Sequence, residues 1–219
     1  MEDTYKYKGM RKNLVNELIQ KGIKDRQVLR AICKIPRHYF FEKAFFEHAY
    51  EDKAFPIGYG QTISQPYTVA YQSELLNVKK GHKILEIGTG SGYQVCVLLE
   101  LGVTVHSIEY KKELFKKTST LLPLMGYQPS LYWGDGSKGL PSAAPFDGII
   151  VTAGAPGIPK ILINQLKIGG RLIIPVGDSK NQSMVSIEKI SDNKIKKKEY
   201  KKFAFVPLVG EFGWNEKKM

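Results

Sequence analysis

The chain has 219 residues, of which 42% are hydrophobic and 25% charged, and this ordinary globular composition excludes a disordered or collagen-like protein. Its 33 Lys and Arg residues against 21 Asp and Glu residues give a net charge of +12, spread along the chain with its densest run at residues 194–202. Lysine greatly outnumbers arginine, whereas base recognition relies on the bidentate arginine fork, so the charge favours a solvated surface over a nucleic-acid site.

The sequence predicts a soluble, cytoplasmic protein. No apolar run approaches the roughly 20 residues that a transmembrane helix needs, and the first residues lack the apolar core of a signal peptide. Cys33 and Cys96 are the only cysteines and stand far apart, which suits a reducing compartment and argues against thiolate metal sites. We therefore expect two free, mostly buried thiols.

Residues 1–53 are expected to form a helical N-terminal extension. Leu14 and Leu18 recur at helical spacing, and Asp25 is placed to cap a second helix that ends before Pro36. Residues 54–67 then interrupt the pattern with several Gly and Pro residues and few charges. This segment is too broken to predict a regular element and too apolar for a plain surface loop, so we expect it to line a substrate and cofactor site.

After a helix that contains Val69 and Leu76, short apolar strands alternate with helices, which predicts an α/β fold. The predicted strands are 83–87, 103–109, 130–133, 146–152 and 171–176. The predicted helices between them are 92–101, 111–124 and 159–166. Two further strand-like runs joined by a turn at 191–193 predict an antiparallel hairpin at the sheet edge. We expect a single domain, 1–219, with a cofactor-binding core at 80–177 and C-terminal strands and a tail at 178–219.

The strongest local motif is ILEIGTGSG at residues 84–92, a buried strand that ends in a glycine-rich turn and opens a helix. Gly88 and Gly90 let the backbone approach a ligand closely, and amides at the helix N-terminus favour an anionic group. Glu109 ends the next predicted strand, 21 residues after Gly88, where a Rossmann-like fold places the carboxylate for ribose hydroxyls. The pattern predicts an adenosine-containing cofactor.

The spacing of this turn distinguishes among such cofactors. Tyr93 occupies the position of the last glycine in the G-x-G-x-x-G pattern of dinucleotide sites. Glu86, just before the turn, is a poor neighbour for a pyrophosphate but a suitable one for a cationic amino acid group. Both observations favour S-adenosylmethionine. Asp135 and Gly136 follow the third predicted strand, where the carboxylate is placed to accept a hydrogen bond from adenine; a plain Asp-Gly turn is the alternative.

Together with the cofactor motif, several segments resemble the protein-L-isoaspartate O-methyltransferase family of class I S-adenosylmethionine-dependent methyltransferases. The most specific is PIGYGQTISQPY at residues 56–67. The others are IPR at 35–37, LEIGTGSGYQ at 85–94, GDG at 134–136, PFDGIIVT at 145–152, GGRLIIPVG at 169–177 and FVPL at 205–208. The resemblance implies a Rossmann-like class I methyltransferase fold, with a mostly parallel sheet, helices on both faces and an antiparallel C-terminal edge. One departure is Ala204, where bacterial members carry arginine.

The resemblance implies methyl transfer from S-adenosylmethionine to the free α-carboxylate of L-isoaspartyl residues in damaged proteins and peptides, with S-adenosyl-L-homocysteine as product. The ester cyclises to a succinimide that reopens partly to normal aspartate, which begins repair. Because a carboxylate is already ionised at neutral pH, catalysis should rest on in-line positioning and exclusion of water. We expect a monomeric enzyme that uses no metal, acts on isoaspartyl proteins and peptides, and binds neither membranes nor nucleic acid.

The family's site residues carry over to matching positions of this sequence. Ser64 is expected to be the active-site residue and to orient the substrate, since no histidine stands in a motif that would activate it as a nucleophile. A hydroxyl that caps the next helix is the alternative role for Ser64. The expected cofactor-binding residues are Gln61, Thr62, Glu86, Gly88, Gly90, Glu109, Asp135 and Gly136. The expected substrate-binding residues are Ile57, Ile63, Ser64, Val206 and Leu208, and the backbone of 205–208 is a candidate to pair with an extended peptide.

Three other functions share parts of this pattern. A methyltransferase acting on RNA or on another small nucleophile would keep the cofactor site, and RNA would suit the positive charge. Residues 152–156, TAGAP, lack the Asn/Asp-Pro-Pro-aromatic motif of amino-directed nucleic-acid enzymes, although carbon- and hydroxyl-directed enzymes stay open. Tyr93 and Glu86 oppose a nicotinamide dehydrogenase. The intact QTISQP at 61–66 opposes a cofactor-binding protein without catalysis.

Overall fold

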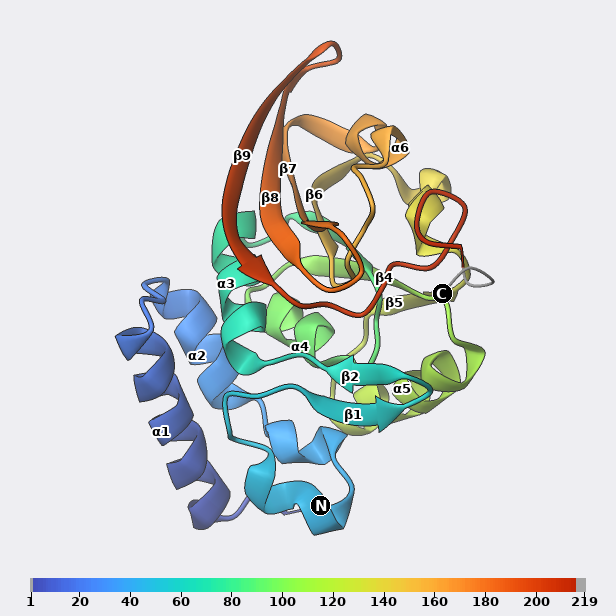
Figure 1. Ribbon diagram of the computed structural model, residues 1–219. Coiled ribbons are helices and arrows are strands. Elements are labelled where there is room, and N and C mark those ends of the chain that lie inside the picture. Colours follow the sequence, from blue (N-terminus) through green and yellow to red (C-terminus); the bar gives the residue numbers. More distant parts are fainter. Residues whose placement is uncertain (1, 216–219) are drawn as a thin grey trace.

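The computed structural model describes residues 2–215, and its centre is a seven-stranded sheet with the strand order β5-β4-β3-β6-β7-β8-β9 (Figure 1). Five strands run parallel to one another: β3 (Lys83–Ile87), β4 (Thr104–Glu109), β5 (Ser130–Trp133), β6 (Phe146–Val151) and β7 (Leu166–Gly177). The hairpin of β8 (Gln182–Ser191) and β9 (Lys194–Phe203) adds an antiparallel edge. The predicted Rossmann-like sheet with an antiparallel C-terminal edge is therefore confirmed.

Helices cover both faces of the sheet, so the central strands are apolar on both sides. On one face lie α3 (Pro66–Leu76), α4 (Tyr93–Glu100) and α5 (Lys112–Leu124), with α1 (Tyr5–Gln20) and α2 (Arg26–Lys34) outside them (Figure 1). The short α6 (Lys160–Asn164) packs on the other face. Ile84 and Ile150 belong to the first hydrophobic cluster, whereas their neighbours Leu85 and Ile149 belong to the second.

The predicted elements agree with the structure except at a few boundaries. The helix predicted over 159–166 has only five residues, because Leu166 already pairs with Phe146 and begins β7. The observed strand β7 is longer than the predicted strand 171–176, because it begins at Leu166. Asp25 caps α2 as predicted, accepting hydrogen bonds from the amides of Gln27 (2.7 Å) and Val28 (3.2 Å). Cys33 and Cys96 are free thiols, and Cys96 is buried.

Residues 54–67 contain an element that we did not expect. β1 (Phe55–Gly58) and β2 (Gln61–Ile63) form an antiparallel hairpin in which Phe55 pairs with Ile63. The expectation that this segment is too broken to form an element was wrong, because Gly58 stands at the last position of β1 and Gly60 in the turn, where neither prevents the strands from pairing. Tyr59 and Gly60 adopt positive φ angles of 56° and 69° there, a conformation that glycine adopts without steric cost.

The order of the strands creates a crevice at their carboxyl ends. From β3 the chain moves outward through β4 and β5, then returns to place β6 on the other side of β3. The connections after β3 and β6 therefore diverge, and ligands of open α/β sheets bind at such a switch point. Within residues 2–215, none of the helices has the length and hydrophobicity needed to cross a bilayer.

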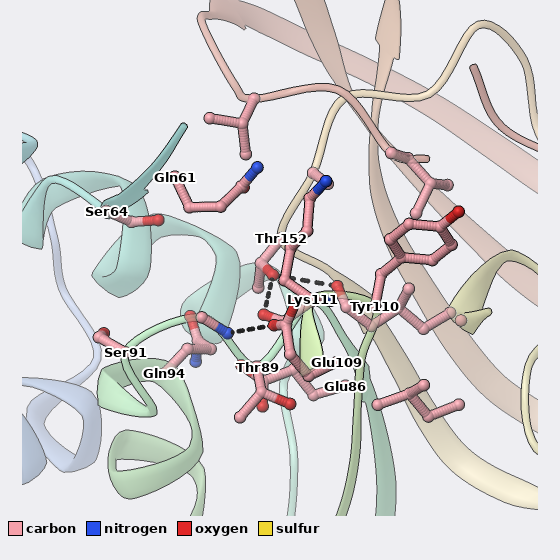
Figure 2. A pocket seen from close by; sticks show the side chains of 18 of the residues that line it. Gln61, Ser64, Glu86, Thr89, Ser91, Gln94, Glu109, Tyr110, Lys111 and Thr152 are labelled. Carbon is pink, nitrogen blue, oxygen red and sulfur yellow. Dashed lines mark hydrogen bonds between the residues drawn. The ribbon is translucent and has the colours of Figure 1, made fainter. Parts of the chain in front are cut away.

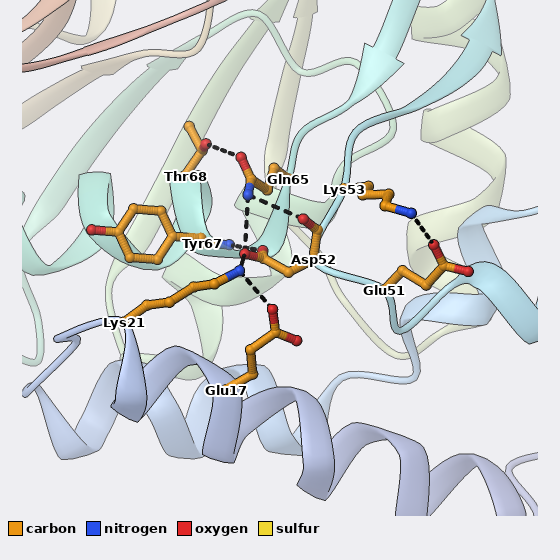
Figure 3. A network of polar contacts seen from close by, with 8 residues as sticks. All are labelled: Glu17, Lys21, Glu51, Asp52, Lys53, Gln65, Tyr67 and Thr68. Carbon is orange, nitrogen blue, oxygen red and sulfur yellow. Dashed lines mark hydrogen bonds and ion pairs between the residues drawn. The ribbon is translucent and has the colours of Figure 1, made fainter.

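A polar network joins α1 to the start of α3 (Figure 3). The Asp52 side chain, only 2% exposed, accepts a hydrogen bond from the Tyr67 amide (2.7 Å) through Oδ1. Its Oδ2 accepts hydrogen bonds from Lys21 Nζ (2.6 Å) and Gln65 Nε2 (3.0 Å). The Tyr67 amide lies in the first turn of α3, where amides lack intrahelical partners, and Gln65 provides no side-chain cap. Asp52 therefore caps α3 from a distant part of the chain.

Replacing Asp52 with alanine should lower the free energy of unfolding by about 1–2 kcal/mol, because the first turn of α3 loses its acceptor. Denaturant unfolding measures this change. Glu17→Gln is the matched control: it removes the other, partly exposed partner of Lys21 and should change stability by less than about 0.5 kcal/mol. Equal stability of the two variants would contradict the capping role.

Candidate active site

One cavity lies at the carboxyl ends of β3, β4 and β6, where segments far apart in the sequence meet (Figure 2). Ten of the predicted site residues line it: Gln61, Thr62, Ser64, Glu86, Gly88, Gly90, Glu109, Gly136, Val206 and Leu208. Figure 2 shows Gln61 and Ser64 across the cavity from Glu86 and Glu109. The fold thus brings the predicted cofactor turn and the predicted substrate segments to one place.

The glycine turn after β3 is held by a threonine from β6. Gly88 has a φ of +97°, and a Cβ at this position would lie 2.6 Å from Thr152 Oγ1, so no other residue fits. The Thr152 hydroxyl lies 2.6 Å from the Gly88 carbonyl and 3.0 Å from the Ile87 carbonyl and shares its one proton between them. Thr152 therefore fixes the backbone that faces the cavity.

Glu109 is fixed by the same turn. Its Oε2 accepts a hydrogen bond from the Gly90 amide (2.7 Å), and its Oε1 accepts one from the Lys111 amide (2.8 Å). Burial raises the pKa of Glu109, and these amide bonds oppose that shift. Each carboxylate oxygen can accept a second hydrogen bond. The arrangement suits a pair of ligand hydroxyl groups.

Glu86 is fully buried at the floor of the cavity. Its Oε2 accepts from the Ser107 hydroxyl (2.7 Å), which in turn lies 2.7 Å from the Thr89 hydroxyl. No described residue forms a hydrogen bond with Oε1. Burial, with a smaller contribution from the charge of Glu109, raises the pKa of Glu86 to about 8. An orphaned buried carboxyl oxygen is costly unless a donor or a cation meets it.

Gln94, in the first turn of α4, presents a similar unpaired acceptor. Its Nε2 donates to the Ser73 hydroxyl (2.9 Å), while its Oε1 is buried and has no partner among residues 2–215. Both Gln94 and Glu86 line the cavity. Two unpaired acceptors beside the glycine turn fit the ammonium group of an amino acid, and Glu109 fits the ribose. The residues present therefore fit S-adenosylmethionine.

A buried arginine, Arg37, holds the segment that carries Ser64 through a hydrogen bond to its backbone. Arg37 donates from Nη2 to the Ser64 carbonyl (3.0 Å) and from Nε to the Ala49 carbonyl (2.9 Å). The guanidinium also lies 4.5 Å from the centre of the Tyr93 ring. Burial lowers the pKa of Arg37 to about 10, so the side chain stays cationic at neutral pH. No hydrogen bond between the Ser64 hydroxyl and an amide of α3 is found among residues 2–215, and the Tyr67 amide in the first turn is bonded to Asp52 instead.

Three predicted site residues lie outside the cavity lining. Ile63 is buried in the core, and Ile57 lies beside Gly90 in a small neighbouring hollow. Asp135 uses Oδ1 to accept from the amide (2.9 Å) and hydroxyl (2.6 Å) of Ser137, and Oδ2 to accept from the Glu211 amide (2.9 Å). Both oxygens of the Asp135 carboxylate therefore already accept hydrogen bonds from the protein. The contact of Asp135 with adenine stays a prediction.

Several cavity residues were not predicted, among them Thr152, Gln94 and Tyr110. The rule that found Glu109 at the end of β4 also applies to Thr152 at the end of β6, so this residue had a usable signal. No sequence pattern pointed to Gln94, because its place in the cavity depends on which face of α4 meets the cavity. The described residues that line the cavity include no histidine, so the structure offers Ser64 no imidazole base there.

Comparison with known proteins shows which family this chain belongs to. The model of the protein-L-isoaspartate(D-aspartate) O-methyltransferase family matches residues 9–213. A protein-L-isoaspartate O-methyltransferase from Cytophaga hutchinsonii is 56% identical over 217 residues, covering 99% of this chain and 98% of the relative. One from Flavobacterium psychrophilum is 59% identical over 210 residues, covering 95% and 98%.

Solved structures give the same result. A protein-L-isoaspartate O-methyltransferase is similar with a TM-score of 0.82 and 29% identity, covering 93% of this chain and 67% of that one. A Plasmodium falciparum chain named as such an enzyme, in complex with S-adenosyl-L-homocysteine, has a TM-score of 0.77 and 26% identity, covering 91% and 98%. With its fold, its cavity and the family match over nearly its whole length, the chain belongs to the protein-L-isoaspartate(D-aspartate) O-methyltransferase family.

Proposed function

We propose that this chain transfers the methyl group of S-adenosylmethionine to the free α-carboxylate of L-isoaspartyl residues in proteins and peptides, which begins their repair through a succinimide. Membership of the family supports this activity. The observation that supports the location of the reaction is the single cavity that joins Glu86 and Glu109 to Ser64. S-adenosyl-L-homocysteine is then the second product.

On the cofactor side, the geometry of the cavity supports each assignment. When bound, S-adenosylmethionine supplies a methyl group on a cationic sulfonium, which a carboxylate oxygen attacks. We assign the ribose hydroxyls to Glu109 and the ammonium group to Glu86. The backbone of Gly88 and Gly90 allows the close approach of the ligand. Gln61 and Thr62 border the opposite wall and separate the site from water.

On the substrate side, orientation is the main task. The substrate carboxylate is ionised at neutral pH, so the protein need not remove a proton. We propose that the Ser64 hydroxyl donates one hydrogen bond to this carboxylate and leaves a lone pair free for the attack. Val206 and Leu208 provide the neighbouring wall against which an extended peptide can lie. Positioning of this kind can supply a large part of a rate enhancement.

We further propose that isoaspartyl-containing proteins and peptides are the partners of a cytoplasmic monomer. This chain supplies both the cofactor-side and the substrate-side residues of the cavity. The two free cysteines suit a reducing compartment. Light scattering of the purified chain with and without an isoaspartyl peptide tests the monomer.

The activity is tested with methyl-labelled S-adenosylmethionine and two peptides that differ only in L-isoaspartate or normal aspartate at one position. Label that mild base releases from the isoaspartyl peptide alone is the expected result, because a carboxyl methyl ester hydrolyses readily. Failure to label either peptide while S-adenosyl-L-homocysteine still binds would contradict repair and would make RNA the next substrate to test.

Substitutions of Ser64 and of Glu109 should have different effects, one on turnover and the other on cofactor binding. Ser64→Ala should lower kcat roughly tenfold or more, because the substrate carboxylate loses its orienting hydrogen bond, and should leave the Kd of S-adenosyl-L-homocysteine within about twofold. Glu109→Ala should weaken cofactor binding, since the ribose acceptor is lost. Initial rates and titration calorimetry measure the two effects. An equal loss of cofactor affinity in both variants would contradict this division.

Arg37 should act on turnover through the position of Ser64. Arg37→Gln should lower kcat roughly tenfold, with S-adenosyl-L-homocysteine binding close to wild type, because the carbonyl that anchors Ser64 loses its donor. Arg37→Lys, which retains the charge and one donor group, should recover part of the loss. Arg171→Gln removes an arginine bonded to the Leu75 carbonyl and to Glu188, away from this segment, and serves as the control. A kcat reduced equally in the control would contradict the role.

Glu86 should release a proton when the cofactor binds. With a pKa of about 8, its carboxyl is mainly protonated at pH 7, and an adjacent ammonium favours the carboxylate. Affinity should therefore increase as pH rises toward 8, by at most about tenfold per pH unit. Calorimetry with S-adenosyl-L-homocysteine in phosphate and in Tris at pH 7 measures the released protons. Glu86→Gln has no such proton, so equal release from this variant would contradict the assignment.

A further inference from the structure

A second cavity adjoins the active site on the side of β9. It shares four lining residues with the first cavity, Thr62, Ser64, Thr152 and Val206. Its far wall comes from the end of β9, where Lys201 and Lys202 stand, and from the first turn of α3. A substrate whose carboxylate reaches Ser64 therefore has a direct path into this second cavity.

A bulge in β9 directs Lys201 toward α3. Val185 of β8 pairs with Glu199 and Ser183 pairs with Lys202, so β9 has one residue more than β8 between these pairs. The Lys201 ammonium lies 4.2 Å from the centre of the Tyr67 ring and 4.8 Å from that of Tyr71, and it donates to the Tyr67 hydroxyl. These contacts hold one positive charge in the cavity wall.

Lys202 brings a second positive charge to the same cavity. Lys202 is exposed, and none of the ion pairs found within residues 2–215 includes it. The positive charge of Lys202 attracts the Asp178 carboxylate. That carboxylate already accepts hydrogen bonds from the amides of Asn181 and Lys180, both at 2.7 Å. Those two bonds, with a smaller contribution from Lys202, lower the pKa of Asp178. Lys202 thus retains the capacity to pair with a ligand carboxylate.

The rest of β9 is also basic, but its lysines stand outside the lining of the second cavity. Four more lysines of β9 are exposed: Lys194, Lys196, Lys197 and Lys198. Glu199 is the one acidic residue of the strand. A cavity bordered by charges of one sign attracts ligands of the opposite sign and disfavours those of the same sign.

We propose that the second cavity receives the peptide segment that flanks the isoaspartyl residue and that Lys202, assisted by Lys201, selects acidic side chains in that segment. The proposal rests on the proposed function, because the isoaspartyl carboxylate at Ser64 is what directs the peptide into this cavity. An extended chain advances about 3.3 Å per residue, so the selected side chain lies within a few residues of the isoaspartate. The ligand class is an acidic isoaspartyl peptide.

The test uses isoaspartyl peptides that carry Glu, Gln or Lys two residues before or two residues after the isoaspartate. We expect kcat/KM to fall in the order Glu, Gln, Lys on one side of the isoaspartate, by about two- to fivefold per step, as for a partly exposed ion pair. High salt should reduce the differences. Lys202→Gln should remove most of this discrimination, and Lys202→Glu should reverse it. Lys196→Gln, on the same strand but outside the cavity lining, is the matched control and should retain the order.

The neutral peptide separates this proposal from the function on which it rests. Base-labile methylation of the Gln peptide with no preference among Glu, Gln and Lys would overturn the proposal and leave the repair function intact. Equal loss of discrimination in Lys196→Gln and Lys202→Gln would also overturn it, since the preference would then come from the general charge of β9. Absence of methylation on every peptide would overturn both.

Discussion

The substrate side of this enzyme depends on the hydrogen bonds of one buried guanidinium. Arg37 donates to the carbonyls of Ala49, Lys53 and Ser64, which belong to a stretch with little regular structure of its own. Buried carbonyls need partners, and a planar group with five donors can serve several at once. The same guanidinium lies over Tyr93, the first residue of α4 after the glycine turn. The substrate segment and the cofactor turn are therefore fixed against a single side chain.

Asp52 complements this arrangement from the other side of Ser64. It binds Gln65 and the Tyr67 amide, so the residues after Ser64 are held as firmly as its own carbonyl. The negative charge of Asp52 also favours the cationic form of Arg37 despite complete burial. In the proposed active site, Ser64 lies between two anchored points and can keep one orientation without a histidine partner. This rigidity suits a reaction that relies on alignment.

The sequence predicted the positions of the residues on the β3 and β4 side of the cavity better than it predicted how the segment around Ser64 is held. Parallel strands end at a common edge, so Glu86, Gly88 and Glu109 could be placed from strand order and spacing alone. The anchors Arg37 and Asp52 could not, because their partners are main-chain atoms distant in the sequence, and no residue pattern marks such contacts. The β1–β2 hairpin was missed for a related reason: a few pairings in a glycine-rich segment leave almost no periodic signal. Ile63 does not line the cavity, because strand alternation turns its side chain into the core, and its contact with the substrate stays a prediction.

The bonding of Asp135 has a consequence for how this enzyme ages. Glycine after aspartate offers the least steric hindrance when its amide nitrogen attacks the side-chain carboxyl, and the chain has two such pairs, at 135–136 and 147–148. The Asp135 carboxylate is tied to Ser137 and Glu211, and that of Asp147 to the Lys83 amide (2.8 Å) and Lys167 Nζ (2.7 Å). Both carboxyl groups are thus kept from their own glycine amides while the fold persists. Formation of a succinimide at either pair then requires local opening of the native state. A molecule whose opened chain forms isoaspartate there carries the group that the proposed function repairs in other proteins.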